Sequence, residues 1–378
     1  MRTSSPASDI NVRLDSLTGL RWWAAFMVFL FHMRVFAPLP GPVAGIFDQG
    51  YLGVTFFFVL SGFVLTWSYR PQTSISTFYW RRFARIWPAT MAALLFAIPV
   101  FYYLGFGQST PEFELKPFDI GILFLSVVLI QGWWSNPVIF FSGNPAAWTL
   151  TFEAFFYALH PWISKLLTSW SKRGALFLAF GAISSMFVFR LALYIWPTSW
   201  LALVPGPVYR LPEFVLGMAL AWAIRSGWRP RLHPILGVGS IAAVVLAIVV
   251  AVRIPALSPI AYFNNELFTA AVGCAIVSLS VAKLNGRSSI FDSKVQVKLG
   301  EWSFAFYLVH ATVIYLMLRL LGPQEASWTN LAWMALVFAI DLLLAWLLHA
   351  FVERPAEKAL RKWKDRRDAP RLETATPA

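Results

Sequence analysis

Arg21 and His32 lie 11 residues apart in the first apolar stretch of the chain, residues 20–38. At 100° per residue, this spacing places both side chains within about 20° of one helix face, about 16 Å apart along the axis. A histidine can take up a proton near neutral pH, so it can act as a general acid or base. The pair therefore predicts a helix on which one stripe runs from a guanidinium at one end to an imidazole in the middle.

Two later apolar stretches place polar groups on one helix face in the same way. Their members follow the spacing i, i+4, i+7, which brings side chains together on a helix surface. The two sets are Glu153, Tyr157 and His160, and Ser303, Tyr307 and His310. Each set predicts a polar stripe on an otherwise apolar helix.

Arg81, Arg82 and Arg85 fall within five residues at the expected start of another helix. Three arginines so placed can clamp a diphosphate or a 3′-phosphate. They are explained equally well by the tendency of positive residues to collect on the cytoplasmic side of membrane helices. Both interpretations stay open at this point.

The elements that must position these residues are membrane-spanning helices. Hydrophobic residues make up 58% of the chain and charged residues only 13%, against roughly a quarter in soluble domains. Apolar stretches near twenty residues long predict spanning helices. Eleven such stretches occur, at about 20–38, 51–69, 86–106, 118–133, 148–167, 175–195, 209–225, 235–253, 263–282, 299–320 and 331–352. The sequence thus predicts an all-α, polytopic membrane helix bundle.

The basic residues predict the orientation of this bundle. Of the 31 Lys and Arg, 25 fall in the segments 1–21, 70–85, 165–173, 225–231, 283–298 and 354–371. The intervening segments 39–50, 134–147, 196–208, 254–265 and 321–330 hold none. By the positive-inside rule, both termini are then cytoplasmic. Basic, cytoplasmic loops and uncharged, extracytoplasmic loops must alternate along the chain. Eleven crossings break this alternation, and ten crossings satisfy it if one apolar stretch does not span. We expect that stretch to be 118–133, as an interfacial or re-entrant helix.

Apolar stretches, net charge and cysteine count also limit the number of domains and the kinds of ligand that we expect. We expect one integral membrane domain over residues 1–355, followed by a short basic cytoplasmic tail over 356–378. The net charge of +13 follows from the cytoplasmic loops, and no nucleic-acid-binding motif appears. Cys274 is the one cysteine, so an intramolecular disulfide and a thiolate zinc cluster are excluded, and we expect no metal site.

Ionisable groups at membrane depth are costly and usually functional. Arg34, Arg190, Arg253 and Arg319 lie at outer helix ends, where snorkelling to the interface explains them. Five further groups lie deeper, namely His32, Glu153, Glu213, His310 and Asp341. Polar pairs between helices would explain each of them singly. Together they favour a polar cavity inside the bundle.

Seven ordered motifs along the chain resemble the acyltransferase-3 family of membrane O-acyltransferases. They lie at residues 14–21 (LDSLTGLR) with His32, 53–63 (GVTFFFVLSGF), 78–88 (FYWRRFARIWP), 148–157 (WTLTFEAFFY), 212–217 (PEFVLG), 299–310 (LGEWSFAFYLVH) and 352–355 (VERP). The family is similar in having about ten core helices. Each motif alone is weak, but seven in order on the expected helices are specific.

The resemblance implies an activity and roles for residues. It implies acyl-CoA, usually acetyl-CoA, as a donor substrate, no permanently bound cofactor, and a carbohydrate or glycolipid hydroxyl as acceptor at a bacterial inner membrane. It assigns His32 as the catalytic histidine, Arg21 as its motif partner and Glu153 as a functional acid. It assigns Arg81, Arg82 and Arg85 to the donor. For His310, a second base, an oxyanion donor and a structural hydrogen-bonding group stay open.

Some positions depart from the family pattern. Thr55 stands where Asp is frequent, Thr149 where Ser is frequent, and Phe304 where Tyr is frequent, which leaves the acceptor undefined. Many relatives carry an added extracytoplasmic hydrolase-like domain. This chain ends soon after its last apolar stretch, so we expect direct transfer or a separate extracytoplasmic transferase partner.

Two other classes of protein fit the composition. In a proton-coupled secondary transporter, buried Glu, Asp and His would carry protons. Such transporters usually have two related halves, and the sequence has no internal repeat. A scaffold protein without chemistry would not explain the stripe from Arg21 to His32.

Overall fold

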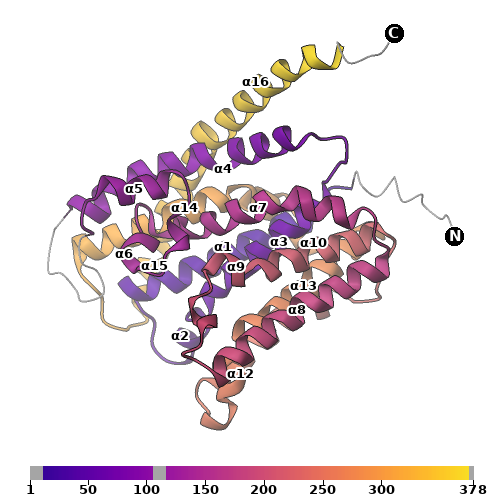
Figure 1. Ribbon diagram of the computed structural model, residues 1–378. Coiled ribbons are helices and arrows are strands. Elements are labelled where there is room, and N and C mark those ends of the chain that lie inside the picture. The colour runs from indigo at the N-terminus through magenta and orange to yellow at the C-terminus, as the bar shows by residue number, and fades with distance from the viewer. Residues whose placement is uncertain (1–11, 105–115, 374–378) are drawn as a thin grey trace.

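The computed structural model describes residues 12–104 and 116–373, with side chains described as far as Asp368. These residues form helices joined by short turns and include no strand. Figure 1 shows the long helices packed side by side as a bundle, with the last helix projecting from it. The predicted all-α fold class is confirmed.

Ten helices of 15 to 28 residues build the bundle in the described ranges, and shorter helices lie in the connections. The long ones are α1 (Asp15–Phe36), α3 (Gly53–Trp67), α4 (Ile75–Ile98), α7 (Trp148–Leu167), α8 (Lys172–Ile195), α10 (Leu211–Arg225), α11 (Pro234–Ala251), α13 (Asn264–Leu284), α14 (Lys294–Leu321) and α15 (Asn330–Leu348). The short ones are α2 (Pro42–Phe47), α5 (Ile120–Val127), α6 (Pro137–Phe140), α9 (Gly206–Tyr209) and α12 (Ser258–Tyr262).

Seven helical segments of the described chain are long and apolar enough to cross a membrane. They are Pro42–Trp67, Ile75–Tyr103, Lys172–Ile195, Pro234–Ala251, Asn264–Leu284, Lys294–Leu321 and Asn330–Asp368. The predicted count of about ten spanning helices is therefore not confirmed. The helices α1, α7 and α10 are missing from this set. The last has only 15 residues, and polar side chains lower the hydropathy of the other two.

The charged turns gather at one end of the bundle. The helices α1, α4, α8, α11 and α14 begin at this end, and α3, α7, α10 and α13 finish there, beside Arg70, Arg225 and Lys283. We name it the basic end. The opposite end, which carries α2, α12 and the 196–205 connection, is named the neutral end. Serine side chains cap three helices at the basic end. Ser74, Ser171 and Ser293 accept hydrogen bonds from backbone N–H groups of α4, α8 and α14.

Glycines allow two helix pairs to approach closely. A Cβ built on Gly300 of α14 would lie 1.9 Å from the carbonyl oxygen of Thr18 on α1. A Cβ on Gly217 of α10 would lie 1.9 Å from the carbonyl oxygen of Val59 on α3. Small residues at helix crossings are the usual means of close packing in membranes. Because α1, α3 and α14 all carry candidate site residues, these contacts fix the width of the site.

The segment 118–133 contains one α-helix, α5, which has eight residues, and a three-residue 3-10 turn, η4 (Gln131–Trp133). Such a helix rises about 12 Å, too little to cross the hydrocarbon core. It packs beside α4, where the indole N–H of Trp87 donates to the carbonyl oxygen of Val127 at 3.1 Å. The structure thus agrees with the prediction that this stretch does not span.

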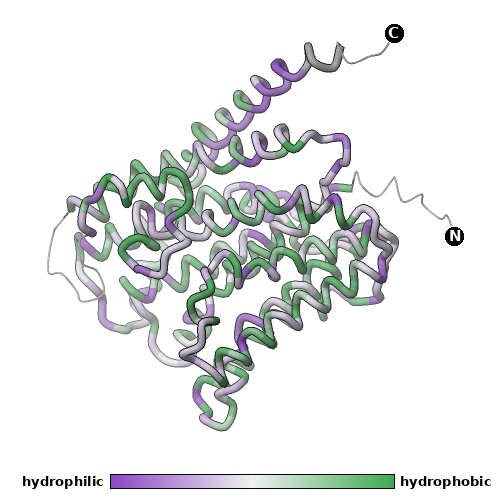
Figure 2. The backbone as a smooth tube through the Cα atoms, in the orientation of Figure 1, coloured by the Kyte–Doolittle hydropathy of each residue, from purple (hydrophilic) through white to green (hydrophobic). Residues whose placement is uncertain are grey.

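The basic C-terminal segment is helical and packs against α4. A π-helical turn, η9 (His349–Glu353), continues α15 into α16 (Arg354–Glu373). Figure 2 shows α16 as largely hydrophilic, in contrast to the bundle helices. The rings of Trp80 and Trp363 are in tilted contact with centroids 4.8 Å apart, and Trp80 donates to the carbonyl oxygen of Leu360 at 2.8 Å. The sequence had predicted the charge of this segment but not its helix or its contact.

Candidate active site

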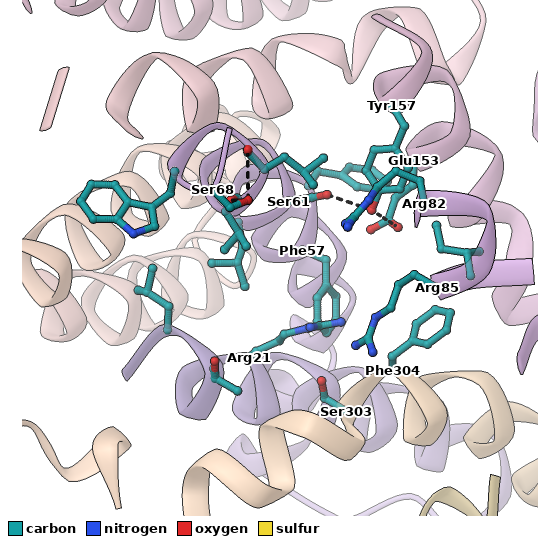
Figure 3. Close-up of a pocket in the computed structure, with 18 of the residues that line it drawn as sticks. Arg21, Phe57, Ser61, Ser68, Arg82, Arg85, Glu153, Tyr157, Ser303 and Phe304 are labelled. Carbon is teal, nitrogen blue, oxygen red and sulfur yellow. Dashed lines mark hydrogen bonds between the residues drawn. The ribbon is translucent and has the colours of Figure 1, made fainter. Parts of the chain in front are cut away.

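A cavity of about 460 Å³ enters the bundle from the basic end, between α1, α3, α4, α7 and α14. Its lining includes the exposed residues Ser68 and Arg70, so it opens at that end. Deeper, it is lined by Arg21, Arg82, Arg85, Ser61, Glu153, Tyr157, Ser303 and Tyr307. Figure 3 shows the side chains of Arg21 and Arg85 directed into the same space, with Arg82 beside Glu153.

Two of the three cavity arginines inside the mouth make no direct ion pair. Arg21 and Arg82 have no hydrogen-bond or ion-pair partner among the residues that the structure describes. Arg85 differs, because its Nη1 lies 2.7 Å from Oε1 of Glu353 and 3.2 Å from Oε2 of Glu357. Unpaired guanidinium groups facing a cavity form a site for an anionic ligand.

Arg81 does not share this cavity. Its Nη2 lies 3.7 Å from Oδ1 of Asp365 on α16, where both side chains are largely exposed. On the helix surface Arg85 lies between the other two, about 60° from Arg82 and about 40° from Arg81. Arg82 and Arg85 line the cavity, and Arg81 lies on the far side of Arg85 from Arg82. The structure therefore groups Arg82 and Arg85 with Arg21 and leaves Arg81 on the α16 side.

Glu153 is held by a short chain of hydroxyl groups. The hydroxyl of Ser61 on α3 donates to the Tyr157 oxygen at 3.1 Å, and the Tyr157 hydroxyl donates to Oε2 of Glu153 at 2.9 Å. This orients the carboxylate among the arginines of the cavity. His160, expected on the same stripe, lies outside the cavity lining. Its ring contacts the hydroxyl groups of Thr66 at 3.3 Å and Ser164 at 3.2 Å.

His32 and His310 meet one helical turn beyond the closed end of the cavity. That end is formed in part by Tyr307, which precedes His310 by three residues on α14. Nδ1 of His32 lies 3.3 Å from Nε2 of His310, and the ring centroids are 4.9 Å apart. The sequence had placed these residues on separate helices without predicting their contact.

Backbone carbonyl groups define the protons on both imidazoles. Nδ1 of His32 lies 2.9 Å from the carbonyl oxygen of Val28, and Nδ1 of His310 lies 2.6 Å from that of Tyr307. A carbonyl oxygen only accepts, so each Nδ1 carries a proton in the neutral ring. The single Nδ1–H of His32 is then shared between two acceptors, the Val28 carbonyl oxygen at 2.9 Å and Nε2 of His310 at 3.3 Å. Nε2 of His32 has a lone pair and no hydrogen-bond partner among the described residues.

The other deep polar groups lie elsewhere, so the expectation that all five share one cavity is wrong. Glu213 sits in a network between α3, α10 and α13. It accepts from Arg210 at 3.0 Å and from Asn265 at 2.8 Å, and Arg210 also donates to Thr55 at 2.8 Å. Asp341 of α15 is fully buried, and neither oxygen has a partner in the described chain. Neither acid lines the cavity, because each faces a different helix contact.

Sequence reasoning missed three residues of this site. Glu353 is fully buried, binds Arg85, and lies 3.0 Å from Nδ1 of His349. It belongs to the 352–355 motif, whose position in sequence gave no sign of this partner. Arg13 and Arg70 line the mouth of the cavity, and a count of basic residues alone could not separate them from other loop arginines. Among the described residues, no group of three His, Cys, Asp or Glu could hold a metal ion.

Comparison with known proteins gives a family and three informative relatives. A family model described as an acyltransferase domain matches residues 14–350. The acyltransferase MdmB of Streptomyces mycarofaciens is 32% identical over 373 residues, which is 92% of this chain and 93% of the relative. The peptidoglycan O-acetyltransferase OatA of Listeria monocytogenes is 26% identical over 91% of this chain and 56% of its own length. Nodulation protein 10 of Rhizobium leguminosarum is 29% identical over 44% of this chain. No solved structure matches.

Proposed function

Because the chain belongs to the acyltransferase-3 family and is therefore a membrane O-acyltransferase, we propose that its donor is cytoplasmic acyl-CoA, with acetyl as the acyl group. We propose as acceptor a hydroxyl of an extracytoplasmic or lipid-linked carbohydrate. The observation that carries this proposal is a cavity that opens at the basic end, holds unpaired Arg21 and Arg82, and stops one helical turn short of His32.

The donor fits this cavity by charge and by length. Arg21 and Arg82 attract phosphate groups, and Arg85 adds a cation already partly neutralised by Glu353. Arg21 and His32 lie on α1 about 16 Å apart along the axis, so a pantetheine arm anchored at the arginines extends toward His32. Phe57 and Phe58 provide apolar walls along this route.

The tautomer of His32 supports a role as general base in this proposal. The oxygen of the acceptor hydroxyl forms a bond to the thioester carbonyl carbon, while Nε2 of His32 accepts the hydroxyl proton. The carbon–sulfur bond then breaks, and the CoA thiolate leaves and takes the proton from the imidazolium. His310 is a positioning residue in this scheme, because its Nε2 accepts from Nδ1 of His32 and holds the ring.

The acceptor reaches His32 from the neutral end in this proposal. His32 lies four residues before the end of α1 and is only partly buried, and the cavity from the basic end does not include it in its lining. The relative OatA is named for O-acetylation of peptidoglycan, which supports a carbohydrate as the class of acceptor. We further propose that the protein lies in a bacterial inner membrane with both termini cytoplasmic.

Purified full-length protein, incubated with labelled acetyl-CoA and candidate carbohydrates, tests the proposal. We expect label to move to the carbohydrate as an ester that hydroxylamine releases, and we expect no transfer by the His32→Ala variant. Transfer by the purified chain alone would also remove the need for a separate extracytoplasmic partner. A folded protein that neither binds acetyl-CoA nor transfers label would contradict the proposed donor.

A further inference from the structure

The mouth of the cavity carries a cation separate from the arginines inside. Arg70 lies in the turn that follows α3, lines the mouth and is exposed. Its side chain has no hydrogen-bond or ion-pair partner within the described part of the chain. Arg13, also in the lining, is already paired. Its Nε lies 2.7 Å from Asp15, and its Nη2 lies 3.2 Å from Glu301. Arg70 thus offers an unneutralised charge at the entrance.

The unpaired cations stand at two depths. Trp67, three residues before Arg70, donates its indole N–H to the carbonyl oxygen of Val12 at 3.2 Å. The turn with Arg70 is therefore level with the residues that precede α1. Arg21 lies six residues after the start of α1, about 9 Å deeper along the axis. A ligand that satisfies both levels has two anionic groups separated along its length.

We propose that Arg70 binds the 3′-phosphate of the donor nucleotide, while Arg21 and Arg82 bind its diphosphate. This inference rests on the proposed acyl-CoA donor. CoA carries a phosphate monoester on its ribose, and the diphosphate follows one sugar away, before the pantetheine arm. The order of cations from the mouth inward matches the order of anions along CoA. The adenosine then stays at the basic end in water, and the thioester points toward Tyr307.

The assignment makes Arg70 the residue that distinguishes between donors. A thioester on the phosphopantetheine of a carrier protein has one phosphodiester and lacks a 3′-phosphate. It would satisfy the interior arginines and leave Arg70 without a ligand. A donor with the 3′-phosphate gains one charge-assisted contact, which corresponds to roughly a 10- to 100-fold difference in affinity.

Binding of CoA and of dephospho-CoA, which lacks only the 3′-phosphate, tests the assignment on the purified full-length protein. Wild type and the Arg70→Gln, Arg82→Gln and Arg287→Gln variants are compared at one salt concentration. Arg287 is the matched control, because it is an exposed arginine at the basic end and lies outside the cavity lining. Its loss changes the net charge equally.

We expect wild type to prefer CoA over dephospho-CoA by about 10- to 100-fold. Arg70→Gln should abolish the preference by weakening CoA alone, Arg82→Gln should weaken both ligands by similar factors, and Arg287→Gln should change neither. Arg70→Gln that weakens both ligands equally, or has no more effect than Arg287→Gln, overturns the assignment and leaves the donor proposal intact. A folded wild type that binds neither ligand overturns both.

Discussion

Nε2 of His32 is the atom on which the proposed transfer depends. The Nδ1 proton of each histidine faces a backbone carbonyl oxygen, and that of His32 is shared with Nε2 of His310, so Nε2 of His32 keeps its lone pair for the acceptor hydroxyl. Removing a general base typically costs 10²- to 10⁴-fold in rate. We therefore expect His32→Ala to lose acyl transfer by at least about that factor while binding CoA normally.

The same substitution has a structural cost that can be measured separately. His32→Ala leaves Nε2 of His310 without its donor, a loss of about 1 kcal/mol in stability. The melting temperature should fall slightly, and product formation should be measured on the same preparation. His160→Gln is the control, since His160 is buried among hydroxyl groups outside the cavity. Near-normal turnover by His32→Ala would remove His32 from the mechanism and favour His310.

Arg82 and Arg81 form a natural pair of test and control residues. The resemblance assigned both to the donor, but Arg82 lines the cavity and Arg81 faces Asp365. Arg82→Gln should weaken CoA binding by about 1.5–3 kcal/mol, the magnitude of a hydrogen bond to a charged group. Arg81→Gln should change binding little. Calorimetric titration of both variants decides, and equal weakening by the two would restore Arg81 to the donor site.

At the residue scale, the sequence predicted several residues that line the cavity, but it did not predict which residues contact one another across helices. The helical spacing and the motifs identified Arg21, Arg82, Glu153 and Tyr157, and these four do line one cavity. The spacing of polar residues along one helix does not predict which neighbouring helix packs against its polar face. The contact of His32 with His310 spans 278 positions of sequence, so it emerges only once α1 packs on α14.

At the element scale, close helix contacts set the geometry of the site. Gly300 lets α14 approach α1, and a methyl group there would meet the backbone of Thr18, which cannot move aside easily. Gly300→Ala should therefore push α14 from α1, separate His310 from His32, and lower both stability and turnover. Overpacking of this kind costs typically 1–3 kcal/mol.

Gly181→Ala in α8 is the matched control, because a Cβ there meets nothing within 4 Å. The free energy of unfolding should stay the same or rise slightly, since alanine favours a helix more than glycine does. Thermal unfolding and acyl transfer should be measured for both variants. Equal stability of the two would show that the contact between α1 and α14 is looser than the structure indicates.

Elements also differ in how far the sequence could predict them. Apolar length predicted α8 and α11 without difficulty, because most of their apolar side chains lie on the outside of the bundle, and it also predicted α13, which is largely buried. The helix α16 was predicted only as a basic tail. Its acids Glu357 and Asp365 turn toward Arg85 and Arg81 of α4, and a charge count cannot reveal such pairing.

For the whole molecule, the distribution of charge and the position of the cavity both support the proposed orientation. The basic residues gather at the end where the cavity opens, and translocating such residues is unfavourable. A cytoplasmic basic end would also give the cavity access to acyl-CoA, which is made inside the cell. In the opposite orientation, the cavity would open outside the cytoplasm, where acyl-CoA is absent. The proposed donor therefore requires the basic end to be cytoplasmic.

Labelling of single cysteines measures this orientation directly. In a Cys274→Ser background, Ile290→Cys marks the basic end and Leu203→Cys marks the neutral end. The wild-type side chains at these two positions are 79% and 81% exposed, so access to solvent is matched. In intact cells, a membrane-impermeant maleimide should label the Leu203→Cys variant, and the Ile290→Cys variant should react only after the membrane is permeabilised. Labelling of the Ile290→Cys variant in intact cells would place the cavity mouth outside. The donor would then have to be an extracytoplasmic anion other than acyl-CoA, even if every contact within the bundle is correct.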